Sequence, residues 1–284
     1  MPDGFDLASE IAAGVQDRHR AWTFIRGFAR AWSTPLRDGD GYDGGELDAA
    51  EERLGFPFPA ALREAYTLFG KRADLCATMH RLEPPGGLYV YEDTGLVMYH
   101  AENQGAWERY IRPADLHMDD PPTAHSCDRG HEEHATGVAW TERLSIALID
   151  MVLEETLWGG AAQLSLRGEL LEAEIPAVER QFVRLGFPQL PIEESPCTLG
   201  HRWYAGEDVL VCVQPYLPLT EEQEALRAPW GRPRSRAGFI VRGRTPKAVA
   251  AAYKSLPAEC FSQAQRRWPT EGAGHGLGDS DDRE

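Results

Sequence analysis

Apolar residues recur once per helical turn at the start of the chain and alternate with polar residues further on. Over residues 6–32 the apolar and aromatic positions are Leu7, Ile11, Val15, Trp22, Ile25, Phe28 and Trp32. This period predicts one amphipathic helix over 6–32 that packs its aromatic side onto the rest of the protein. Binding of this basic, Trp-bearing helix to a membrane surface is the alternative. The Gly- and Asp-rich stretch 37–45 then predicts a flexible connector.

Two short helices are expected next, separated by a glycine stop and a proline start. Their apolar positions are Leu47, Ala50 and Leu54, followed by Leu62, Tyr66 and Phe69. Gly55 is placed to cap the end of the first helix, and Gly70 ends the second. Pro57 and Pro59 lie where the second helix begins, a position that tolerates proline.

From residue 88 the pattern changes to short alternating runs. The segments 88–91, 96–100 and 106–111 predict an antiparallel meander of at least three strands. Residues 141–158 predict a strong amphipathic helix, whose apolar positions are Leu144, Leu148, Met151, Val152 and Leu157. The pattern over 169–185 allows a further helix.

The last third of the chain reads as a strand-strand-helix extension. Residues 201–214 resemble a hairpin that turns at 206–208, and residues 237–257 predict a strand and then a helix that starts at Thr245 and Pro246. The Gly-rich tail from about residue 265 is expected to be disordered. This order of elements predicts an α+β fold, an antiparallel sheet meander flanked by helices.

Charge separates some functional classes from others. The chain has 284 residues, with 29 basic and 45 acidic side chains and a formal charge of −16. Such a balance disfavours general nucleic-acid binding, which needs a Lys- and Arg-rich surface, and would attract a basic partner. Residues 92–155 hold fourteen acidic residues, four arginines and no lysine. This acidic window is either a solvated surface or a docking face for a basic protein.

Cysteine usage and segment composition indicate the compartment. The five cysteines are scattered and form no CxxC pair, which fits a reducing cytoplasm better than a disulfide framework. The N-terminus lacks the pattern of a secretory signal, and no stretch approaches the ~18 apolar residues of a membrane helix. We therefore expect a soluble, cytoplasmic protein.

An ordered set of motifs spans residues 44–160. The first part consists of Glu51, Leu54, Gly55, Phe58, Pro59, Tyr66 and Gly70. The second part consists of an ENQG corner with a following Trp107, the element Asp120-Pro121-Pro122, and Trp140 ahead of an apolar helix. This set resembles the SUKH superfamily, which includes yeast regulators of cell-wall assembly and killer-toxin resistance and many bacterial immunity proteins. Thr123 departs from the pattern, because an apolar β-branched residue is expected there.

The resemblance implies a SUKH-like α+β domain that binds proteins and performs no catalysis. In bacteria the implied role is often that of an immunity protein that neutralises a polymorphic toxin, commonly a nuclease. Such toxins are often basic, because they grip phosphates, which is compatible with the acidic window. The candidate partner-binding residues are Glu102, Asn103, Gln104, Trp107, Asp119, Asp120, Glu132 and Glu133.

Two of these motifs also have a simpler structural interpretation. The ENQG corner can simply satisfy its own backbone in a local turn. The stretch HSCDRGHEEH supplies His125, Cys127, His131 and His134, which are residue types that bind zinc, but their spacing matches no familiar zinc motif. A solvated loop is the simpler interpretation, and no cofactor or catalytic group is assigned.

Three functional hypotheses follow from the sequence. The first is an immunity protein of the SUKH type, and the second is a scaffold or regulatory protein of the same fold without a toxin partner. The third is a metal-dependent hydrolase built on the His-rich loop. The predicted organisation is a helix and connector over 1–43, a SUKH-like core over 44–160, an extension over 161–265 that completes the same domain by adding to its sheet, and a disordered tail over 266–284.

Overall fold

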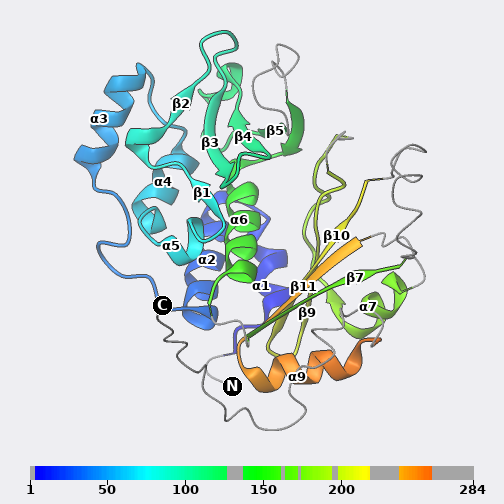
Figure 1. Ribbon diagram of the computed structural model, residues 1–284. Helices are drawn as coiled ribbons and strands as arrows, with labels where there is room; N and C mark the ends of the chain where they lie inside the picture. The colour runs from blue at the N-terminus through cyan, green and yellow to red at the C-terminus, as the bar shows by residue number, and fades with distance from the viewer. Residues whose placement is uncertain are drawn as a thin grey trace, which may run out of the picture.

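Two antiparallel sheets lie on either side of a central helix, α6 (Leu144–Trp158), in an α+β fold (Figure 1). The computed structural model describes residues 4–126, 137–160, 164–171, 174–193, 198–217 and 237–257. Within them the helices are α1 (Leu7–Gly14), α2 (Arg18–Trp32), α3 (Gly44–Leu54), α4 (Ala60–Phe69), α5 (Ala73–Cys76), α6 (Leu144–Trp158), α7 (Ile175–Gln181) and α9 (Pro246–Ser255). The tail that was predicted to be disordered lies outside the described residues.

The predicted helix over 6–32 is two helices, so the expectation of one continuous helix is wrong. Asp17 adopts an extended conformation and its carboxylate accepts a hydrogen bond from the Arg20 backbone N–H at 2.9 Å, which caps α2 and ends the continuity with α1. The aromatic side of α2, including Trp22 and Phe28, is buried in the core shared with α4 and α6. Among the described residues no helix is both long and apolar enough to cross a membrane.

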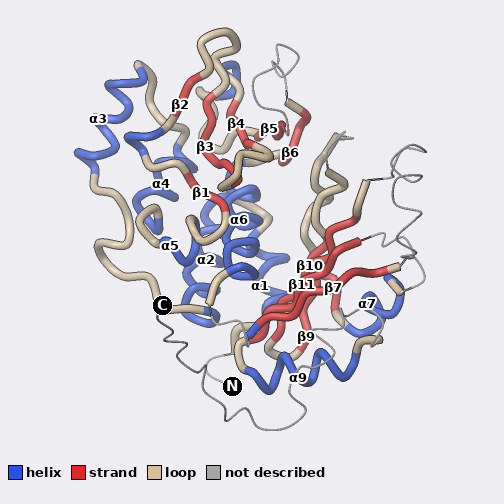
Figure 2. The backbone as a smooth tube through the Cα atoms, viewed as in Figure 1, coloured by secondary structure: helices blue, strands red, loops and turns tan. Residues whose placement is uncertain are grey.

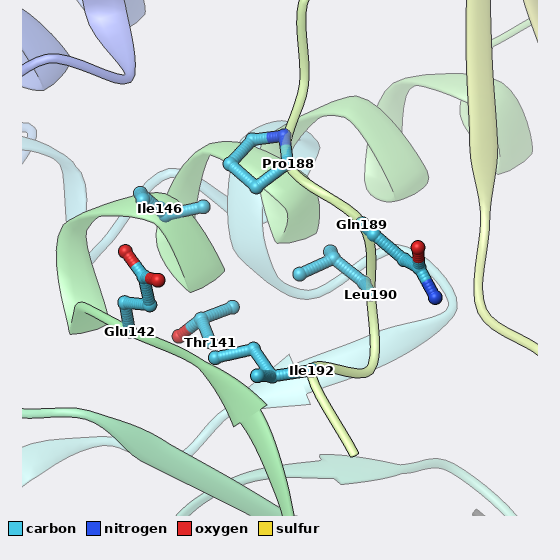
Figure 3. Close-up of a pocket in the computed structure, with 7 residues that line it drawn as sticks. All are labelled: Thr141, Glu142, Ile146, Pro188, Gln189, Leu190 and Ile192. Atoms are coloured by element: carbon cyan, nitrogen blue, oxygen red, sulfur yellow. The ribbon is translucent and has the colours of Figure 1, made fainter. Parts of the chain in front are cut away.

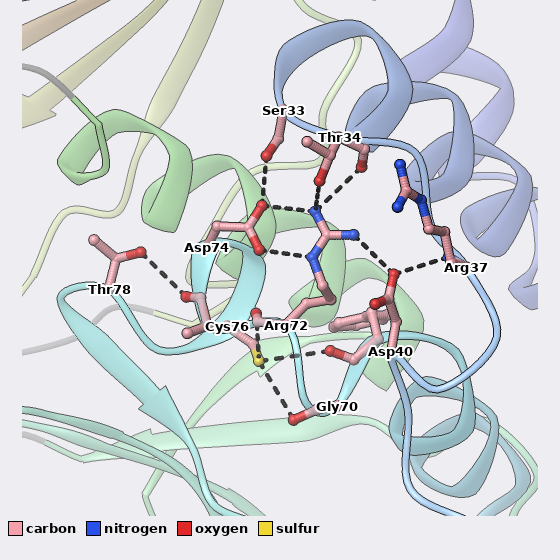
Figure 4. A network of polar contacts seen from close by, with 11 residues as sticks. Ser33, Thr34, Arg37, Asp40, Gly70, Arg72, Asp74, Cys76 and Thr78 are labelled. Atoms are coloured by element: carbon pink, nitrogen blue, oxygen red, sulfur yellow. Dashed lines mark hydrogen bonds and ion pairs between the residues drawn. The ribbon is translucent and has the colours of Figure 1, made fainter.

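The connector after α2 is held in place at several points. The Arg72 guanidinium bonds to Asp40, Asp74 and Thr34, and Ser33 also donates to Asp74 (Figure 4). Gly41 lies so close to α4 that a Cβ there would sit 1.8 Å from the Thr67 carbonyl oxygen. The connector therefore needs glycine for close approach as well as for turning.

Helices α3 and α4 confirm the predicted helix, glycine stop, proline turn and helix. Asp43 and Glu46 form a reciprocal capping box at the start of α3, and Gly55 ends it with a φ of 80°. Glu51 then accepts hydrogen bonds from the Phe58 N–H and from Arg63, both at 2.8 Å. These contacts fix the angle between the two helices.

The first sheet contains the predicted meander and extends it on both sides. Its strands are β1 (His80–Leu82), β2 (Tyr89–Val90), β3 (Val97–Glu102), β4 (Glu108–Ile111), β5 (Thr123–Ser126) and β6 (Val138–Thr141). They run in the order β1-β3-β4-β5-β6, and β2 also pairs with β3 (Figure 2). Irregularities in pairing occur between Met98 and His100 in β3 and next to Trp140 in β6. Bulges of this kind redirect side chains.

Helix α6 is buried on nearly every side, although its sequence predicted an amphipathic helix. The helix begins at Leu144, where the Asp120 carboxylate accepts from the Ser145 N–H at 2.8 Å and from its hydroxyl at 2.6 Å. The first sheet and the N-terminal helices cover part of its surface, and β11 (Ala237–Gly243) packs on another part. The charged residues Asp150, Glu154 and Glu155 are consequently inside the protein.

The C-terminal strands form a sheet of their own, so the expectation that they add to the first sheet is wrong. The strands β7 (Ser165–Leu170), β8 (Val183–Arg184), β9 (Arg202–Gly206), β10 (Val209–Pro215) and β11 (Ala237–Gly243) run in the order β7-β11-β10-β9-β8. The edge of the first sheet is not free for them, because the Ile192 N–H donates to the Ala139 carbonyl of β6 at 3.1 Å. The hairpin over 201–214 is confirmed as β9 and β10.

The two faces of the second sheet pack against different cores. Trp203, Leu210 and Ile240 belong to the core around α6, whereas Tyr204, Val211 and Val241 belong to a second cluster with α7 and α9. The helix allowed over 169–185 is shorter than its pattern suggested. Strand β7 occupies residues to Leu170, and Pro176 starts α7 in its first turn.

Candidate functional site

Helix α6 supplies two buried carboxylates that face the same direction. Asp150 and Glu154 are four residues apart, which places them on one side of the helix. Asp150 is 0% exposed and Glu154 is 2% exposed. Glu155, on an adjacent part of the helix, accepts hydrogen bonds from the backbone N–H groups of residues 78–80, the last at 2.9 Å from His80. Glu155 therefore positions the start of β1 beside the other two carboxylates.

The first sheet presents a row of basic and imidazole side chains to the same space. His100, Arg109 and His125 are direct cross-strand neighbours on β3, β4 and β5. The pairing irregularity at Tyr99 lets both Tyr99 and His100 lie on the inner side, and the Arg109 Nη1 reaches the His100 Nδ1 at 3.4 Å. His80 joins the row from β1, with its ring centroid 6.1 Å from that of His100.

The second sheet contributes His201 and Trp203, which precede and lie within β9. The His201 Nε2 lies 3.2 Å from a Glu154 oxygen, and its Nδ1 lies 3.5 Å from an Asp150 oxygen. The Trp203 indole N–H donates to Asp150 at 3.0 Å. We call these seven residues, His80, His100, Arg109, His125, Asp150, Glu154 and His201, the central cluster. It joins both sheets through α6.

Arg109 is the centre of the central cluster. Its guanidinium carbon lies 4.6 Å from the ring centroid of Trp107 and 4.4 Å from that of Trp140, so two indole rings stack on the cation. Its Nη2 lies 3.1 Å from Glu154 and 3.3 Å from Asp150. The Nε has no hydrogen-bond acceptor among the described residues. A buried cation with one unsatisfied donor is costly.

The central cluster separates its histidines into two electrostatic classes. Burial and the Arg109 charge lower the pKa of His100 far below its ordinary value, and burial lowers the pKa of His125 to about 3. Burial also lowers the pKa of His80. Burial also lowers the pKa of His201. The negative charge of Glu154, together with the charge and hydrogen bond of Asp150, has the larger effect, so the pKa of His201 is raised overall.

Two basic side chains, Arg109 and His201, lie against the carboxylates. Asp150 keeps a lowered pKa despite burial, because His201 and Arg109 stabilise its anion. Burial lowers the pKa of Arg109, and Glu154 and Asp150 raise it by more. The central cluster thus favours the charged forms of Asp150, Arg109 and His201 and the neutral forms of His80, His100 and His125.

Asp150, Glu154 and His201 also have donor atoms close enough together to surround a metal ion. Their orientation favours ion pairs over coordination, because a metal would take one imidazole nitrogen while here each nitrogen of His201 faces a different carboxylate. Arg109 contacts both carboxylates and would compete with a second cation. What the arrangement supports chemically is proton exchange on the histidines.

Two cavities lie against the segment that follows β8, and one of them reaches the central cluster. One, of about 260 Å³, is lined by Thr141, Glu142, Ile146, Pro188, Gln189, Leu190 and Ile192 (Figure 3). The other, of about 290 Å³, reaches His201. Arg184 and Arg202 also line the second cavity, but strand alternation turns their side chains toward Tyr204 and α7, away from His201.

The predicted ENQG corner is mainly a turn whose backbone N–H groups form hydrogen bonds with a side chain of the same turn. The Glu102 carboxylate accepts from the N–H groups of Gln104 at 2.7 Å and Ala106 at 3.0 Å, as the simpler interpretation expected. Asn103 and Gln104 are exposed. Trp107 is half-buried over the central cluster, where its ring packs on those of His80 and His100.

The remaining candidate partner-binding residues do not gather on one face. Asp119 is exposed and contacts Arg18 at 3.4 Å, whereas Asp120 caps α6. Glu132 and Glu133 lie outside the described residues. Within the acidic window, four carboxylate residues, Glu108, Asp150, Glu154 and Glu155, are buried. The acidic window therefore places some of its carboxylates in the interior of the protein and others on its surface.

The candidate metal ligands are also divided. His125 points inward, where its ring centroid lies 4.7 Å from that of Trp140 and 5.7 Å from that of Trp107. Cys127, His131 and His134 lie outside the described residues. The metal-dependent hydrolase therefore stays a prediction, and the one ligand that can be placed packs in the central cluster.

Sequence reasoning missed Arg109, His80, His100, Asp150, Glu154 and His201 as a unit. Two signals were present. Asp150 and Glu154 are spaced four apart in an otherwise apolar helix pattern, and His100 and Arg109 lie within predicted strands. The pairing of sheet and helix that brings them together depends on contacts distant in sequence, which periodicity does not encode.

Comparison with known proteins adds no relative. No family model matches the chain, and no match was found among curated proteins or among solved structures. The resemblance to the SUKH superfamily therefore rests on the motif residues alone and stays a prediction.

Proposed function

We propose that the chain is a cytoplasmic, non-enzymatic protein-binding module of the SUKH type, and more specifically an immunity protein that neutralises a basic, nuclease-type toxin. A scaffold or regulatory protein of the same fold is the second candidate. The observation that carries the proposal is the outer face of the first sheet, where an exposed tyrosine, Tyr89, continues a row of half-buried and buried tyrosines beside carboxylates.

The two faces of the first sheet differ in what they contact. Val97, Tyr99 and Ile111 belong to the core shared with the helices. Tyr89, Met98 and Tyr110 are cross-strand neighbours on β2, β3 and β4 and belong to neither apolar core. We call Tyr89, Tyr91, Met98 and Tyr110 the tyrosine face. Tyr and Met are enriched where proteins bind one another.

The tyrosine face combines a rigid ladder with acidic charge. The rings of Tyr89, Tyr91 and Tyr110 contact one another edge to face, with centroids 4.9 and 5.7 Å apart. The hydroxyls of Tyr91 and Tyr110 both donate to Glu108 at 2.5 Å. Tyr89 is 50% exposed, and Glu92 and Asp93 are exposed at the adjoining turn. A preordered aromatic surface loses little conformational entropy on binding, and its acidic rim favours a basic partner.

Motif residues of the resemblance support the proposed fold type by their structural roles. Glu51 and Gly55 join α3 to α4, and the Tyr66 hydroxyl donates to the Glu83 carbonyl directly after β1. A Cβ at Gly70 would lie 2.8 Å from the Tyr66 carbonyl oxygen and from the Tyr42 ring. Contacts of this kind are expected of residues that define a fold.

The test is capture of a partner from the host lysate with the tagged chain, followed by affinity measurements on that partner. The proposal expects a basic protein with nuclease or toxin features at a ratio near 1:1, whose activity the chain inhibits. Tyr89→Ala and the pair Glu92→Lys/Asp93→Lys should each weaken binding about tenfold or more, since interface centres often lose 1.4 kcal/mol or more on truncation.

Matched controls separate the tyrosine face from general changes in charge and apolarity. Glu52→Lys/Glu207→Lys makes the same charge change at two exposed positions elsewhere, and Val183→Ala truncates a side chain that is 62% exposed. Equal loss of affinity in the test and control variants would remove the assignment of this face. A captured partner that is not inhibited would favour the scaffold.

A further inference from the structure

The cavity of about 260 Å³ at the start of α6 combines apolar walls with one charged side chain (Figure 3). Its apolar walls are the side chains of Ile146, Pro188, Leu190 and Ile192. This volume exceeds the roughly 150 Å³ of a cavity that holds a benzene ring. It falls short of the roughly 300–1,000 Å³ of pockets for drug-sized ligands. The cavity therefore fits one large side chain.

Glu142 is the charged residue of this cavity, and its carboxylate is not paired. It is exposed, and it makes no hydrogen bond or ion pair with any other residue that the structure describes. The next cation along the chain is directed elsewhere, because the Arg143 guanidinium donates to the carbonyls of Val15 and Gln16. The Thr141 hydroxyl is also engaged, since it donates to the Arg143 carbonyl at 2.7 Å.

Capping of α6 does not account for Glu142, although a carboxylate near a helix N-terminus is stabilising. The Asp120 carboxylate accepts from the Ser145 N–H at 2.8 Å, and the Pro121 carbonyl accepts from the Leu144 N–H at 2.7 Å. The start of the helix thus has its acceptors already. The charge of Glu142 is left beside apolar walls, where it can pair with a cation from outside the chain.

The wall opposite α6 is fixed at both ends. The Leu185 N–H donates to the Trp203 carbonyl of β9 at 2.8 Å, and the Ile192 N–H donates to the Ala139 carbonyl of β6 at 3.1 Å. Between these two points Leu190 is 2% exposed and belongs to the core around α6. The cavity is therefore formed before a ligand arrives, which reduces the entropy lost on binding.

We propose that this cavity takes an arginine side chain of a basic partner protein. The aliphatic stem would pack on Ile146, Leu190 and Ile192, and the guanidinium would pair with Glu142. The inference rests on the proposed function, because it names a group by which the toxin is recognised.

Charge and shape both select this occupant. The chain carries a formal charge of −16, Glu142 belongs to the acidic window, and Glu193, next to Ile192, is a second exposed carboxylate residue. Arginine covers apolar surface with its stem while its charged end stays near water. Its planar guanidinium matches the two oxygens of a carboxylate. A purely apolar side chain would leave Glu142 unpaired.

The neighbouring cavity of about 290 Å³ does not suit the same side chain. Its lining includes Arg184, Arg202 and His201, and no Asp or Glu is among its described lining residues. Gln189 lines both cavities, and its amide points away from Glu142 (Figure 3). A guanidinium therefore finds its carboxylate in the first cavity.

The first test is titration of the full chain with N-acetylarginine methylamide, followed by NMR of the Ile146 and Ile192 methyl groups. These signals should shift and saturate. N-acetylcitrulline methylamide, whose urea is neutral, should bind about fivefold more weakly, the upper range for an ion pair that solvent reaches. Glu142→Gln should weaken binding of the arginine compound by about the same factor. The control Glu52→Gln, at an exposed position elsewhere, should bind as wild type.

The second test measures the same variants against a captured toxin. Glu142→Gln should weaken toxin binding about tenfold or more, because the ion pair is desolvated in a complex, and Glu52→Gln should not. Equal binding of the arginine and citrulline compounds, or a Glu142→Gln variant that binds the arginine compound as wild type does, would overturn the proposal. An inhibited toxin that binds both variants equally would remove the cavity from the interface and leave the proposed function. Arginine binding in the cavity without any toxin partner would remove the proposed function and leave an arginine-specific cavity.

Discussion

Two arginines, Arg72 and Arg109, each join distant segments through a pair of carboxylates, yet their surroundings differ. The Arg72 side chain is 11% exposed and uses all three of its nitrogens, in hydrogen bonds to Asp40, Asp74 and Thr34 (Figure 4). The Arg109 side chain is 1% exposed, leaves its Nε unsatisfied, and has four histidines and three tryptophans around it or its carboxylates.

The contrast indicates which network is structural and which can respond. A satisfied network is rigid, and the Arg72 network, made with Asp40, Asp74, Ser33 and Thr34, contains no histidine. A buried network with an unmet donor and several imidazoles stores unfavourable interactions that a proton can change. The Arg72 network therefore serves as a fixed tie for the connector, whereas the central cluster is the part of the interior that is sensitive to conditions.

The largest effect is expected from Arg109→Met. The substitution keeps an apolar side chain between Trp107 and Trp140 but leaves Asp150 and Glu154 with His201 as the one basic side chain within ion-pair distance among the described residues. Removing one partner of a buried ion pair costs about 3–5 kcal/mol of unfolding free energy. Urea denaturation at pH 6.5 measures it, and a loss below about 1 kcal/mol would show that Arg109 does not hold the sheets.

A smaller loss is expected from Arg72→Met. Its carboxylate partners are partly solvated, with side-chain exposures of 22% and 42%, so they remain hydrated when the guanidinium is removed. We expect a loss of about 2 kcal/mol from the charge-assisted hydrogen bonds. The same denaturation series should give a pH profile parallel to that of wild type. A profile that changes shape would put Arg72 in the pH-sensitive class and break the comparison.

The acid response can be assigned to one histidine with His100→Asn. Because the pKa of His100 is lowered on folding, wild type loses stability as pH falls below about 6.5. Each unit of pH can cost about 1.4 kcal/mol for one such group. The variant should therefore have a shallower slope between pH 6.5 and 5.5, measured by urea denaturation at each pH. An unchanged slope would assign the acid response to other groups.

The smallest effect is expected from Ser33→Ala in the Arg72 network. The Ser33 hydroxyl donates to Asp74 at 2.5 Å, but Arg72 already makes two hydrogen bonds to that carboxylate. We expect a loss of about 0.5–1 kcal/mol, typical of one partly exposed hydrogen bond. Thermal unfolding followed by circular dichroism is sufficient, and a loss as large as that of Arg72→Met would show that the tie depends on Ser33.

Local patterns predicted most of the elements but not their arrangement. Helices α3 and α4, the β2 to β4 meander and the β9–β10 hairpin follow from turn chemistry and periodicity, because their signals are close in sequence. The break at Asp17 was missed because apolar spacing continued across it. The second sheet and the burial of α6 could not be predicted, since whether a strand adds to one sheet or starts another depends on tertiary contacts.

The candidate site was the least predictable part for the same reason. In the sequence, its carboxylates are part of the acidic window, and His125 belongs to the stretch interpreted as a polar loop. Each side chain has an ordinary local context. Only the register of β3, β4 and β5, with His100, Arg109 and His125 side by side, and the packing of β9 on α6 bring them together.

Titration of the histidines by NMR in the wild-type chain tests the central claim most directly, because it reads the two electrostatic classes without any variant. The account predicts that His201 titrates above 6.5, that His80, His100 and His125 titrate below it, and that the chemical shifts of Trp203 follow His201. Four buried histidines that all titrate near 6.5, or a His201 that titrates below it, would contradict the account.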